Sequence, residues 1–244
     1  MAKANCSLCG GTGWVVSERD GVSGADRCQC VAEARVQELE ERAKIPKTYS
    51  CASFDNFDAT DTTFGELLKA AMFQIKAYAN KYPQTEKPGL LIVGLPGTGK
   101  THLAVAALRQ LLARGHEGVF FDYLNLLDRI RSSYSEILGA SDREAYRTAL
   151  EIEILLLDDL GAHRVTDWVQ DTVTAIVTHR CNHKLPLIAT TNLPDTKITG
   201  TNDSVRSTLE DRIGERARSR LFEMCRVVRM PGAPDYRVER SVIR

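Results

Sequence analysis

Short, continuous apolar runs alternate along the chain with longer segments whose apolar residues recur three or four positions apart. The continuous runs predict buried strands at residues 90–93, 118–123, 154–157, 186–191 and 225–230. The helical spacing predicts helices at residues 65–80, 102–114, 124–138, 141–151, 166–180 and 205–220. Residues 31–44 are also predicted to be a helix, because they are rich in helix formers and lack Gly and Pro. Buried strands that alternate with helices are typical of an α/β fold, with a mostly parallel sheet flanked by helices.

A glycine-rich loop joins the first of these strands to the next helix. Its residues 94–101 read GLPGTGKT. Glycines let backbone amides point at phosphate oxygens, and the helix N-terminus adds partial positive charge. Lys100 can then reach the β- and γ-phosphates, and the Thr101 hydroxyl can ligate Mg²⁺. We expect a nucleoside triphosphate with Mg²⁺ here, bound by Gly94, Leu95, Pro96, Gly97, Thr98, Gly99, Lys100, Thr101 and His102.

Polar side chains follow two more of the predicted strands. Asp158 and Asp159 come directly after the run 154–157, and Asn192 follows the run 186–191. Because ligands bind at the carboxyl ends of strands in open α/β sheets, we expect these side chains beside the phosphates. Asp158 would hold Mg²⁺, and Asp159 would orient or deprotonate the attacking water. Asn192 would hold that water or the γ-phosphate, unless it is an ordinary turn residue.

Residues 45–64 form a polar, irregular stretch that contains Phe54, Phe57 and Phe64. A segment placed just before a phosphate-binding strand and loop can fold against the nucleotide base. Packing of the three rings into the domain core alone is an equal alternative.

Four of the seven cysteines fall within the first 30 residues. Cys6 and Cys9 form a C-x-x-C pair, and Cys28 and Cys30 form C-x-C after an 18-residue gap. Two short-spaced thiolate pairs suit a closed tetrahedral Zn²⁺ site, whose metal would stabilise a unit too small for a hydrophobic core. Two disulfides or a redox-active C-x-x-C are the alternatives.

The chain has 244 residues, enough for one α/β domain and a small appendage. We expect a zinc-binding unit at residues 1–30, a helical linker with a solvated, charged face at 31–48, and the main domain at 49–244. The formal net charge is zero, so any nucleic-acid contact must come from a local patch. No apolar run approaches the roughly 20 residues of a membrane helix, and no signal-peptide core is present. We therefore expect a soluble, cytoplasmic protein.

Four motifs together resemble those of one group of ATPases. They are the GLPGTGKT loop, LLLDDLG at 155–161, ATTN at 189–192, and GERARSRL at 214–221 with PDYR at 234–237. Over about residues 45–240 the chain resembles the AAA+ ATPases of the DnaC/DnaI helicase-loader group and the closely similar IstB transposition helpers. The N-terminal cysteine unit resembles the zinc-binding, helicase-interacting domain of some loaders. The resemblance implies an AAA+ P-loop core behind a small zinc unit.

The resemblance also implies roles for individual residues. Arg220 matches the arginine finger that completes a neighbouring subunit's site, with Arg216 as the second candidate. Arg237 matches the sensor 2 arginine, which must act from the core domain because too little chain follows it for a helical lid. The Walker A, Walker B and sensor 1 positions fall on Gly94, Gly97, Gly99, Lys100, Thr101, Asp158, Asp159 and Asn192. The implied catalytic residues are Lys100, Asp158, Asp159, Asn192, Arg220 and Arg237.

The predicted helix at 124–138 lies where initiator-type ATPases of this superfamily carry an extra, DNA-facing helix. Arginine, hydroxyl and aromatic side chains suit phosphate and base contacts to single-stranded DNA. A solvated helix face is the alternative. The implied DNA contacts are Arg129, Arg131, Ser132 and Tyr134.

The leading hypothesis is an ATPase that loads the replicative helicase onto single-stranded DNA during DNA replication and self-assembles through its ATP site. Asp159 stands where Glu is commoner, which favours slow hydrolysis that DNA or a partner stimulates. The alternative is an IstB-type ATP-binding helper of a DNA transposase. A P-loop metabolic kinase is a third reading, disfavoured because the arginine-rich C-terminal helix fits oligomerisation better and no acceptor-substrate pocket can be read from the sequence.

Overall fold

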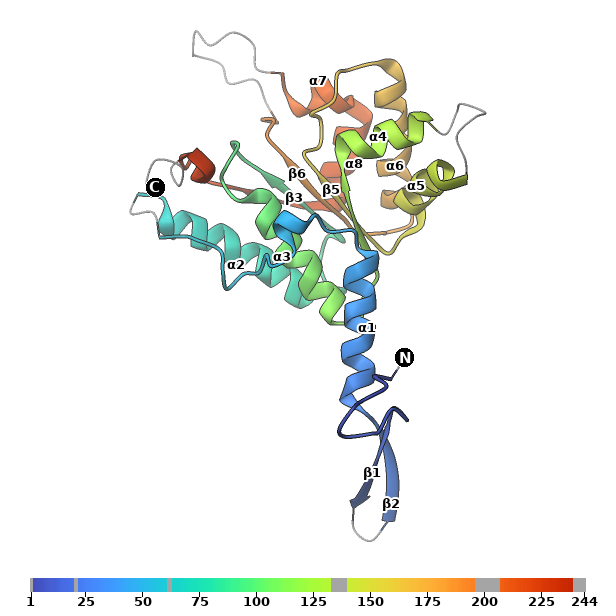
Figure 1. The fold of residues 1–244 in the computed structure, drawn as a ribbon. Helices are drawn as coiled ribbons and strands as arrows, with labels where there is room; N and C mark the ends of the chain where they lie inside the picture. The colour runs from blue at the N-terminus through green and yellow to red at the C-terminus, as the bar shows by residue number, and fades with distance from the viewer. Residues whose placement is uncertain (1, 20–21, 61–62, 133–139, 196–206, 239–244) are drawn as a thin grey trace.

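Five parallel strands form the sheet at the centre of the main body (Figure 1). The computed structural model describes residues 2–19, 22–60, 63–132, 140–195 and 207–238. In spatial order the strands are β4 (Gly118–Asp122), β5 (Ile154–Asp158), β6 (Leu187–Thr191), β3 (Gly89–Val93) and β7 (Cys225–Arg229). Neighbouring strands of this sheet pair in parallel, so their carboxyl ends meet at one edge.

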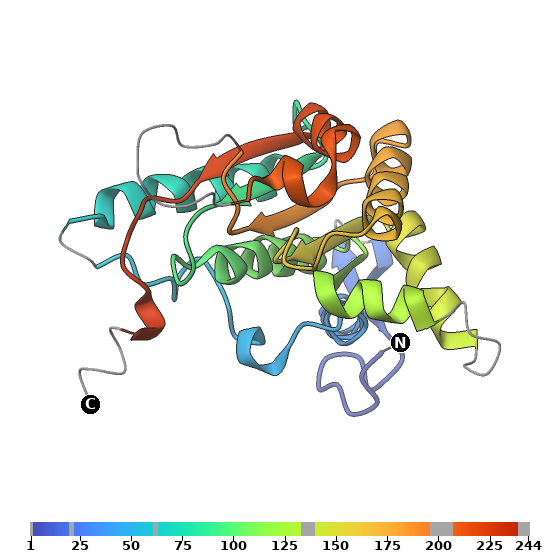
Figure 2. The ribbon, with the colours of Figure 1, turned by 90° about the horizontal axis from the view of Figure 1, so that it is seen from above.

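Helices cover both faces of the sheet, because alternate residues of each strand point to opposite sides. In β3, Leu90 and Ile92 belong to one buried cluster and Leu91 belongs to the other. The first face carries α2 (Gly65–Lys81) and α3 (Lys100–Ala113). The second carries α4 (Tyr123–Ser132), α5 (Ala140–Glu151), α6 (Asp167–Asn182), α7 (Leu209–Ile213) and α8 (Glu215–Met224). Figure 2 shows the layers from above, and the predicted α/β fold is confirmed.

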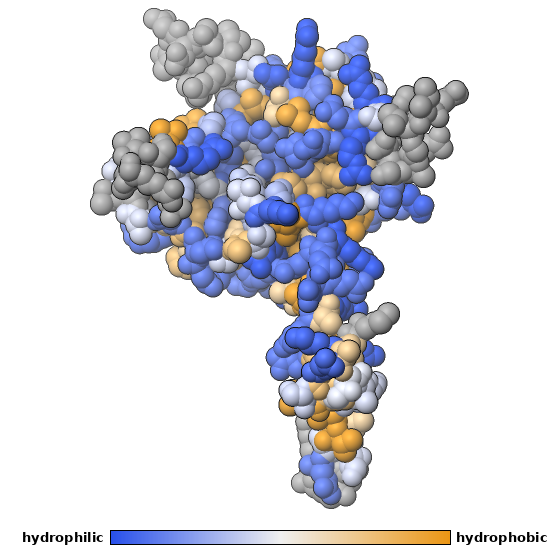
Figure 3. Space-filling view, viewed as in Figure 1, coloured by the Kyte–Doolittle hydropathy of each residue, from blue (hydrophilic) through white to orange (hydrophobic). Residues whose placement is uncertain are grey.

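The N-terminal residues form a small unit at the far end of a projecting helix (Figure 1). Strands β1 (Trp14–Arg19) and β2 (Val22–Arg27) pair antiparallel in a hairpin between the two cysteine pairs. Helix α1 (Gln29–Arg42) follows and connects this cysteine unit, residues 2–30, to the main body. The unit is a narrow projection with apolar side chains on its surface, among them Leu8 and Val16 (Figure 3).

The last turn of α1 packs against the body, which corrects the expectation of a merely solvated helix. Leu39 and Ala43 are buried in the cluster that contains α2 and α3. Glu40 accepts a hydrogen bond from Arg109 Nε of α3 at 2.9 Å. The backbone N–H of Phe120 in β4 donates to the Ala43 carbonyl at 2.7 Å. These contacts anchor the base of the projecting helix beside the edge strand β4.

The prediction of one helix at 205–220 is wrong. The described part of this stretch forms two helices, α7 and α8, which are separated at Gly214. Gly214 has a φ of 84°, a backbone conformation that glycine adopts readily and that ends a helix. The predicted helix at 124–138 is described as α4 as far as Ser132, and its remainder lies outside the described residues. Among the described helices, none has the length and apolarity to cross a membrane.

Candidate nucleotide and metal sites

The loop between β3 and α3 has the backbone geometry of a phosphate cradle. Gly97 and Gly99 have φ values of 76° and 85°, in the left-handed region that favours glycine. Gly99 is the N-cap of α3, and no side chain caps the amides of the first helical turn. The amides and the positive end of the helix dipole therefore face the loop, where an anion would be stabilised.

Lys100 begins α3 and points back into the loop. Its Nζ donates to the Leu95 carbonyl at 2.7 Å, and the residue is only 6% exposed. Burial lowers the pKa of Lys100 to about 8, although the charges of Asp159 and Asp158 partly oppose this shift. The ammonium group thus lies between the Leu95 carbonyl and nearby carboxylates, in a place where phosphate oxygens would give it a stronger partner.

Thr101 and Asp158 meet where α3 approaches the carboxyl end of β5. The Thr101 hydroxyl lies 2.9 and 3.1 Å from the two Asp158 carboxylate oxygens. Thr190 of β6 donates to Asp158 Oδ1 at 2.6 Å. Burial raises the pKa of Asp158, and the hydroxyls of Thr190 and Thr101 oppose the shift. Hydroxyl and carboxylate oxygens are ligands that Mg²⁺ prefers, so Thr101 and Asp158 fit that cation.

Asp159 follows β5 in a left-handed conformation, with a φ of 57° that is uncommon outside glycine. Its backbone N–H donates to Thr190 Oγ1 at 2.9 Å, and its carboxylate accepts from Asn192 Nδ2 at 2.6 Å. Burial raises the pKa of Asp159, while the charge of Lys100 lowers it in part. Because β6 lies between β3 and β5, Thr190 and Asn192 bring the loop and the two carboxylates into one network.

A pocket of about 810 Å³ opens beside the loop. Leu95 and Pro96 line the pocket, together with Asn192 and Arg212. Asp235, from the segment after β7, also lines it. Because Asn192 donates a hydrogen bond to Asp159, the pocket borders the candidate phosphate site at this residue.

The aromatic residues of 45–64 pack into the core, as one of the two alternatives predicts. Phe54 is buried, and Phe57 and Phe64 pack partly buried against the same cluster. Phe57 also lies 5.7 Å from the His102 ring, centroid to centroid. A Cβ placed on Gly99 would lie 2.5 Å from the Phe57 ring. The segment therefore touches the phosphate-loop glycine as well, and contact with a nucleotide base stays a prediction.

The three arginines singled out in the C-terminal region lie in different places. Arg220 is exposed on α8, where its Nη1 lies 2.7 Å from Glu223 Oε2. Arg216 is also exposed, in the first turn of the same helix. Arg237 lies near the loop, because the backbone N–H of its neighbour Tyr236 donates to the Gly97 carbonyl at 3.3 Å. The charge of Arg237 lowers the pKa of both Asp159 and Lys100. The structure therefore brings Arg237, but not Arg220, to the chain's own candidate site.

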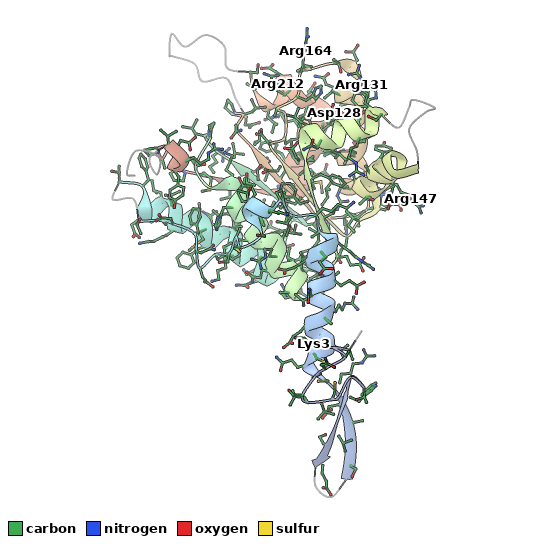
Figure 4. The ribbon with its side chains drawn as sticks, in the orientation of Figure 1. Lys3, Asp128, Arg131, Arg147, Arg164 and Arg212 are labelled. Atoms are coloured by element: carbon green, nitrogen blue, oxygen red, sulfur yellow. The ribbon has the colours of Figure 1, made fainter. Side chains whose placement is uncertain are left out.

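The DNA candidates on α4 are partly engaged within the molecule. The Arg129 guanidinium lies 5.8 Å from the centroid of the Phe121 ring, and Ser132 Oγ donates to the Asp128 carbonyl at 2.8 Å. Arg131 is exposed, and Figure 4 shows it at the opposite end of the molecule from Lys3 in the cysteine unit. Tyr134 lies outside the described residues.

The four N-terminal cysteines come together in a cluster suited to a metal ion. Their sulfurs lie within 4.8 Å of one another, with Cys6 to Cys28 at 3.7 Å and Cys9 to Cys30 at 3.6 Å. These distances are far above the roughly 2 Å of a disulfide bond, and the cysteines are free thiols. Backbone amides of Cys9 and Leu8 face the Cys6 sulfur and lower its pKa, which favours the thiolate that binds metal.

A family model described as the IstB-like ATP binding protein matches residues 30–239. The chain belongs to this family. The match begins at the last cysteine of the cluster and includes the whole network from the phosphate loop to Arg237. ATP binding is the property that the family's description states, and it agrees with the geometry of the loop.

Solved and curated relatives of this IstB-like chain include helicase loaders. The crystal structure of the DnaC helicase loader is 30% identical, with a TM-score of 0.63, over 76% of this chain and all of that one. The replicative helicase loader DnaI of Bacillus subtilis is 24% identical, over 82% of this chain and 63% of DnaI. The phage-like element PBSX protein XkdC of the same organism is 24% identical, over 92% of this chain and 80% of its own length. The predicted resemblance to the DnaC/DnaI and IstB group is confirmed.

Two residues of the IstB-like site have contacts that their sequence motifs do not predict. Thr190 bridges Asp158 and Asp159, whereas the ATTN motif points only to Asn192. Asp235 lines the pocket and contacts the phosphate loop. The ATTN and PDYR motifs contain both residues, but spacing alone does not show that β6 lies between β3 and β5.

Proposed function

We propose that this protein is an ATP-dependent loader of the replicative helicase onto single-stranded DNA. The observation that carries the proposal is the pairing of an ATP site with a metal-suited cysteine unit held away from it on α1. A separate unit on a projecting helix can hold a partner while the ATP site changes state. The relatives named as helicase loaders support this reading.

In the proposed ATP site, each residue of the network has a distinct role. Lys100 binds the β- and γ-phosphates, and Thr101 with Asp158 holds Mg²⁺. Asp159 orients the attacking water, and Asn192 fixes the Asp159 carboxylate to which it donates. Arg237 contacts the nucleotide from the segment after β7. Bound ATP with Mg²⁺ supplies the scissile phosphate and its charge compensation, and these side chains orient them.

In the proposed cysteine unit, the ligands of one Zn²⁺ are Cys6, Cys9, Cys28 and Cys30. A tetrahedral zinc with sulfur ligands at about 2.3 Å requires sulfur-to-sulfur distances of about 3.8 Å. The observed 3.7 and 3.6 Å agree with this arrangement. We propose that residues 1–30 form the helicase-binding unit, 31–48 the linker and 49–244 the ATPase domain.

The proposed partners also include DNA and further copies of the chain. Arg131, with Arg129 and Ser132, would contact the phosphates of single-stranded DNA. Arg220 would reach the γ-phosphate of a neighbouring subunit, since it is exposed and stands apart from the chain's own site. Assembly through the ATP site would then make nucleotide binding and oligomerisation interdependent.

A pull-down with the replicative helicase of the same host tests the proposed function. The full chain should retain the helicase and carry about one zinc per chain. The double variant Cys9→Ser/Cys30→Ser should lose both zinc and helicase, because two of the four ligands are removed. Cys51→Ser is the matched control, since Cys51 is exposed and lies outside the cluster, and it should behave as the wild type.

The pull-down also separates the loader from the second candidate, an IstB-type helper of a DNA transposase. The family model that matches this chain is described as IstB-like, which favours that candidate. The zinc-loaded chain could fail to retain the helicase and instead retain a transposase bound to duplex DNA. That result would replace the proposed loader function with the transposase-helper function.

Arg220→Ala is expected to lose most ATPase activity, because the site of each neighbour would lack the charge that stabilises the departing phosphate. Mixing Arg220→Ala with Asp159→Asn should restore activity. The second variant supplies Arg220, and the first supplies an intact Walker B pair. Phosphate release from the mixture is the measurement. Arg216→Ala in the same mixing assay tests the second candidate, and an Arg220→Ala variant with full activity on its own would refute the finger.

A further inference from the structure

The segment after β7 is docked on the phosphate loop through Asp235 and Tyr236. The Tyr236 backbone N–H donates to the Gly97 carbonyl at 3.3 Å. A Cβ on Gly97 would lie 2.0 Å from Asp235 Oδ1 and 2.6 Å from Asp235 Cα, so any side chain there would displace the segment. Position 97 therefore requires glycine for two reasons: its φ of 76° and the close approach of Asp235.

Asp235 holds Arg237 through three hydrogen bonds. The Arg237 backbone N–H and Nε donate to Oδ1 at 3.0 and 3.1 Å, and Nη2 donates to Oδ2 at 3.1 Å. The two side-chain bonds form a fork on the carboxylate, which fixes the plane of the guanidinium. The Arg237 side chain is 68% exposed and the Asp235 side chain is 27% exposed. The Asp235 side chain is therefore held in place by its surroundings, whereas the exposed Arg237 side chain depends on Asp235 for its orientation.

The held guanidinium lies within electrostatic reach of the candidate phosphate site. The charge of Arg237 acts on both Lys100 and Asp159. Its fork to Asp235 uses Nε and Nη2, and within the described part of the chain the Nη1 edge is left available to a phosphate oxygen. Because Asp235 packs directly against Gly97, it fixes the position of the Arg237 guanidinium relative to the phosphate loop.

We propose that Asp235 is a positioning residue, which holds Arg237 so that it contacts the γ-phosphate of ATP and thereby sets the preference for ATP over ADP. This inference rests on the proposed ATP site and assigns to Asp235 a role in its specificity. Without Asp235, the exposed Arg237 side chain would sample many rotamers. ATP binding would then lose affinity, because it would have to order that side chain. The affinity for ATP alone would decrease, since ADP lacks the phosphate that Arg237 contacts.

A double-mutant cycle on the full chain tests the inference. The affinities for ATPγS and for ADP are measured by titration calorimetry for the wild type, Asp235→Ala, Arg237→Ala and the double variant. Arg237→Ala should weaken ATPγS about tenfold or more, as expected for loss of a charge-assisted hydrogen bond. Asp235→Ala should weaken it about three- to tenfold. Neither should change ADP affinity more than about twofold.

The double variant decides between positioning and a general structural role. It should bind ATPγS as Arg237→Ala does, because Asp235 acts only through that side chain. Glu151→Ala is the matched control: Glu151 pairs with Arg147 Nε at 2.9 Å on the exposed face of α5, and its loss should leave both affinities unchanged. Equal weakening of ATPγS and ADP by Asp235→Ala, or additive losses in the double variant, would overturn the inference and leave the ATP site standing. No effect of Arg237→Ala would overturn the proposed contact of Arg237 together with the inference.

Discussion

Lys100→Ala is expected to weaken ATP binding at least about 30-fold and to abolish measurable ATP turnover. Removing one partner of a desolvated, hydrogen-bonded charge pair costs about 2–5 kcal/mol in binding free energy, and each 1.4 kcal/mol is about tenfold. The cost should be high here because Lys100 is only 6% exposed and residues 94–101 contain no other lysine.

The same substitution should leave the fold intact. Burial lowers the pKa of Lys100, so the nucleotide-free protein holds this ammonium group at a cost, and its loss removes only one hydrogen bond to Leu95. Thermal unfolding should therefore change little in the absence of ATP. Lys69→Ala, at an exposed ion pair with Glu66 on α2, is the control and should keep full ATP affinity. A Lys100→Ala variant that still hydrolyses ATP would refute the phosphate-loop assignment.

The phosphate loop could be predicted because its chemistry is local. A buried strand, a loop with glycines at the positions of positive φ, and a helix start follow one another in sequence, and the structure keeps that order. Asp158 and Asp159 could be placed at the same edge for a similar reason, since parallel strands share their carboxyl edge. Both features depend only on residues close together in the sequence and on the shared carboxyl edge of parallel strands.

The bridge made by Thr190 could not be predicted in this way. It depends on the insertion of β6 between β3 and β5, which no local pattern specifies. Asp235 is a similar case, because its contact with Gly97 joins residues that are far apart in the sequence. Thr190 and Asp235 both lie within sequence motifs, but the residues that they contact can be identified only from the tertiary structure.

The break at Gly214 shows how a periodic pattern can mislead. Leu209, Ile213, Ala217 and Leu221 are all buried and recur every four residues, which is a continuous helical pattern. The chain nevertheless ends one helix and begins another between the second and third of these residues. A single glycine with a φ of 84° changes the direction of the chain while the buried face continues.

Arg180→Met is expected to lower the free energy of unfolding by about 3–5 kcal/mol, as is typical when one partner of a buried charged network is removed. Arg180 lies in the last turn of α6 and is fully buried. A charged residue near a helix end is usually exposed, so sequence alone gave no reason to assign it a core position.

Four backbone carbonyls surround the Arg180 guanidinium. Nη1 donates to Ala149 and Leu150 at 3.0 and 3.3 Å, and Nη2 donates to Glu153 and Pro186 at 2.9 and 2.6 Å. Ala149 and Leu150 belong to the last turn of α5, where a cation also complements the helix dipole. Burial lowers the pKa of Arg180 to about 9, so the side chain remains protonated at neutral pH.

The expected loss follows from what methionine cannot replace. Its side chain fills much of the same volume but donates no hydrogen bond, so the carbonyls at the end of α5 and the start of β6 would be buried without partners. Urea unfolding of the full chain, followed by circular dichroism, measures the change. Arg147→Met is the matched control, because Arg147 is exposed in a pair with Glu151, and it should change stability by less than about 0.5 kcal/mol. A loss below about 1 kcal/mol for Arg180→Met would mean that water reaches these carbonyls, and that the buried guanidinium is not what joins α5, α6 and β6.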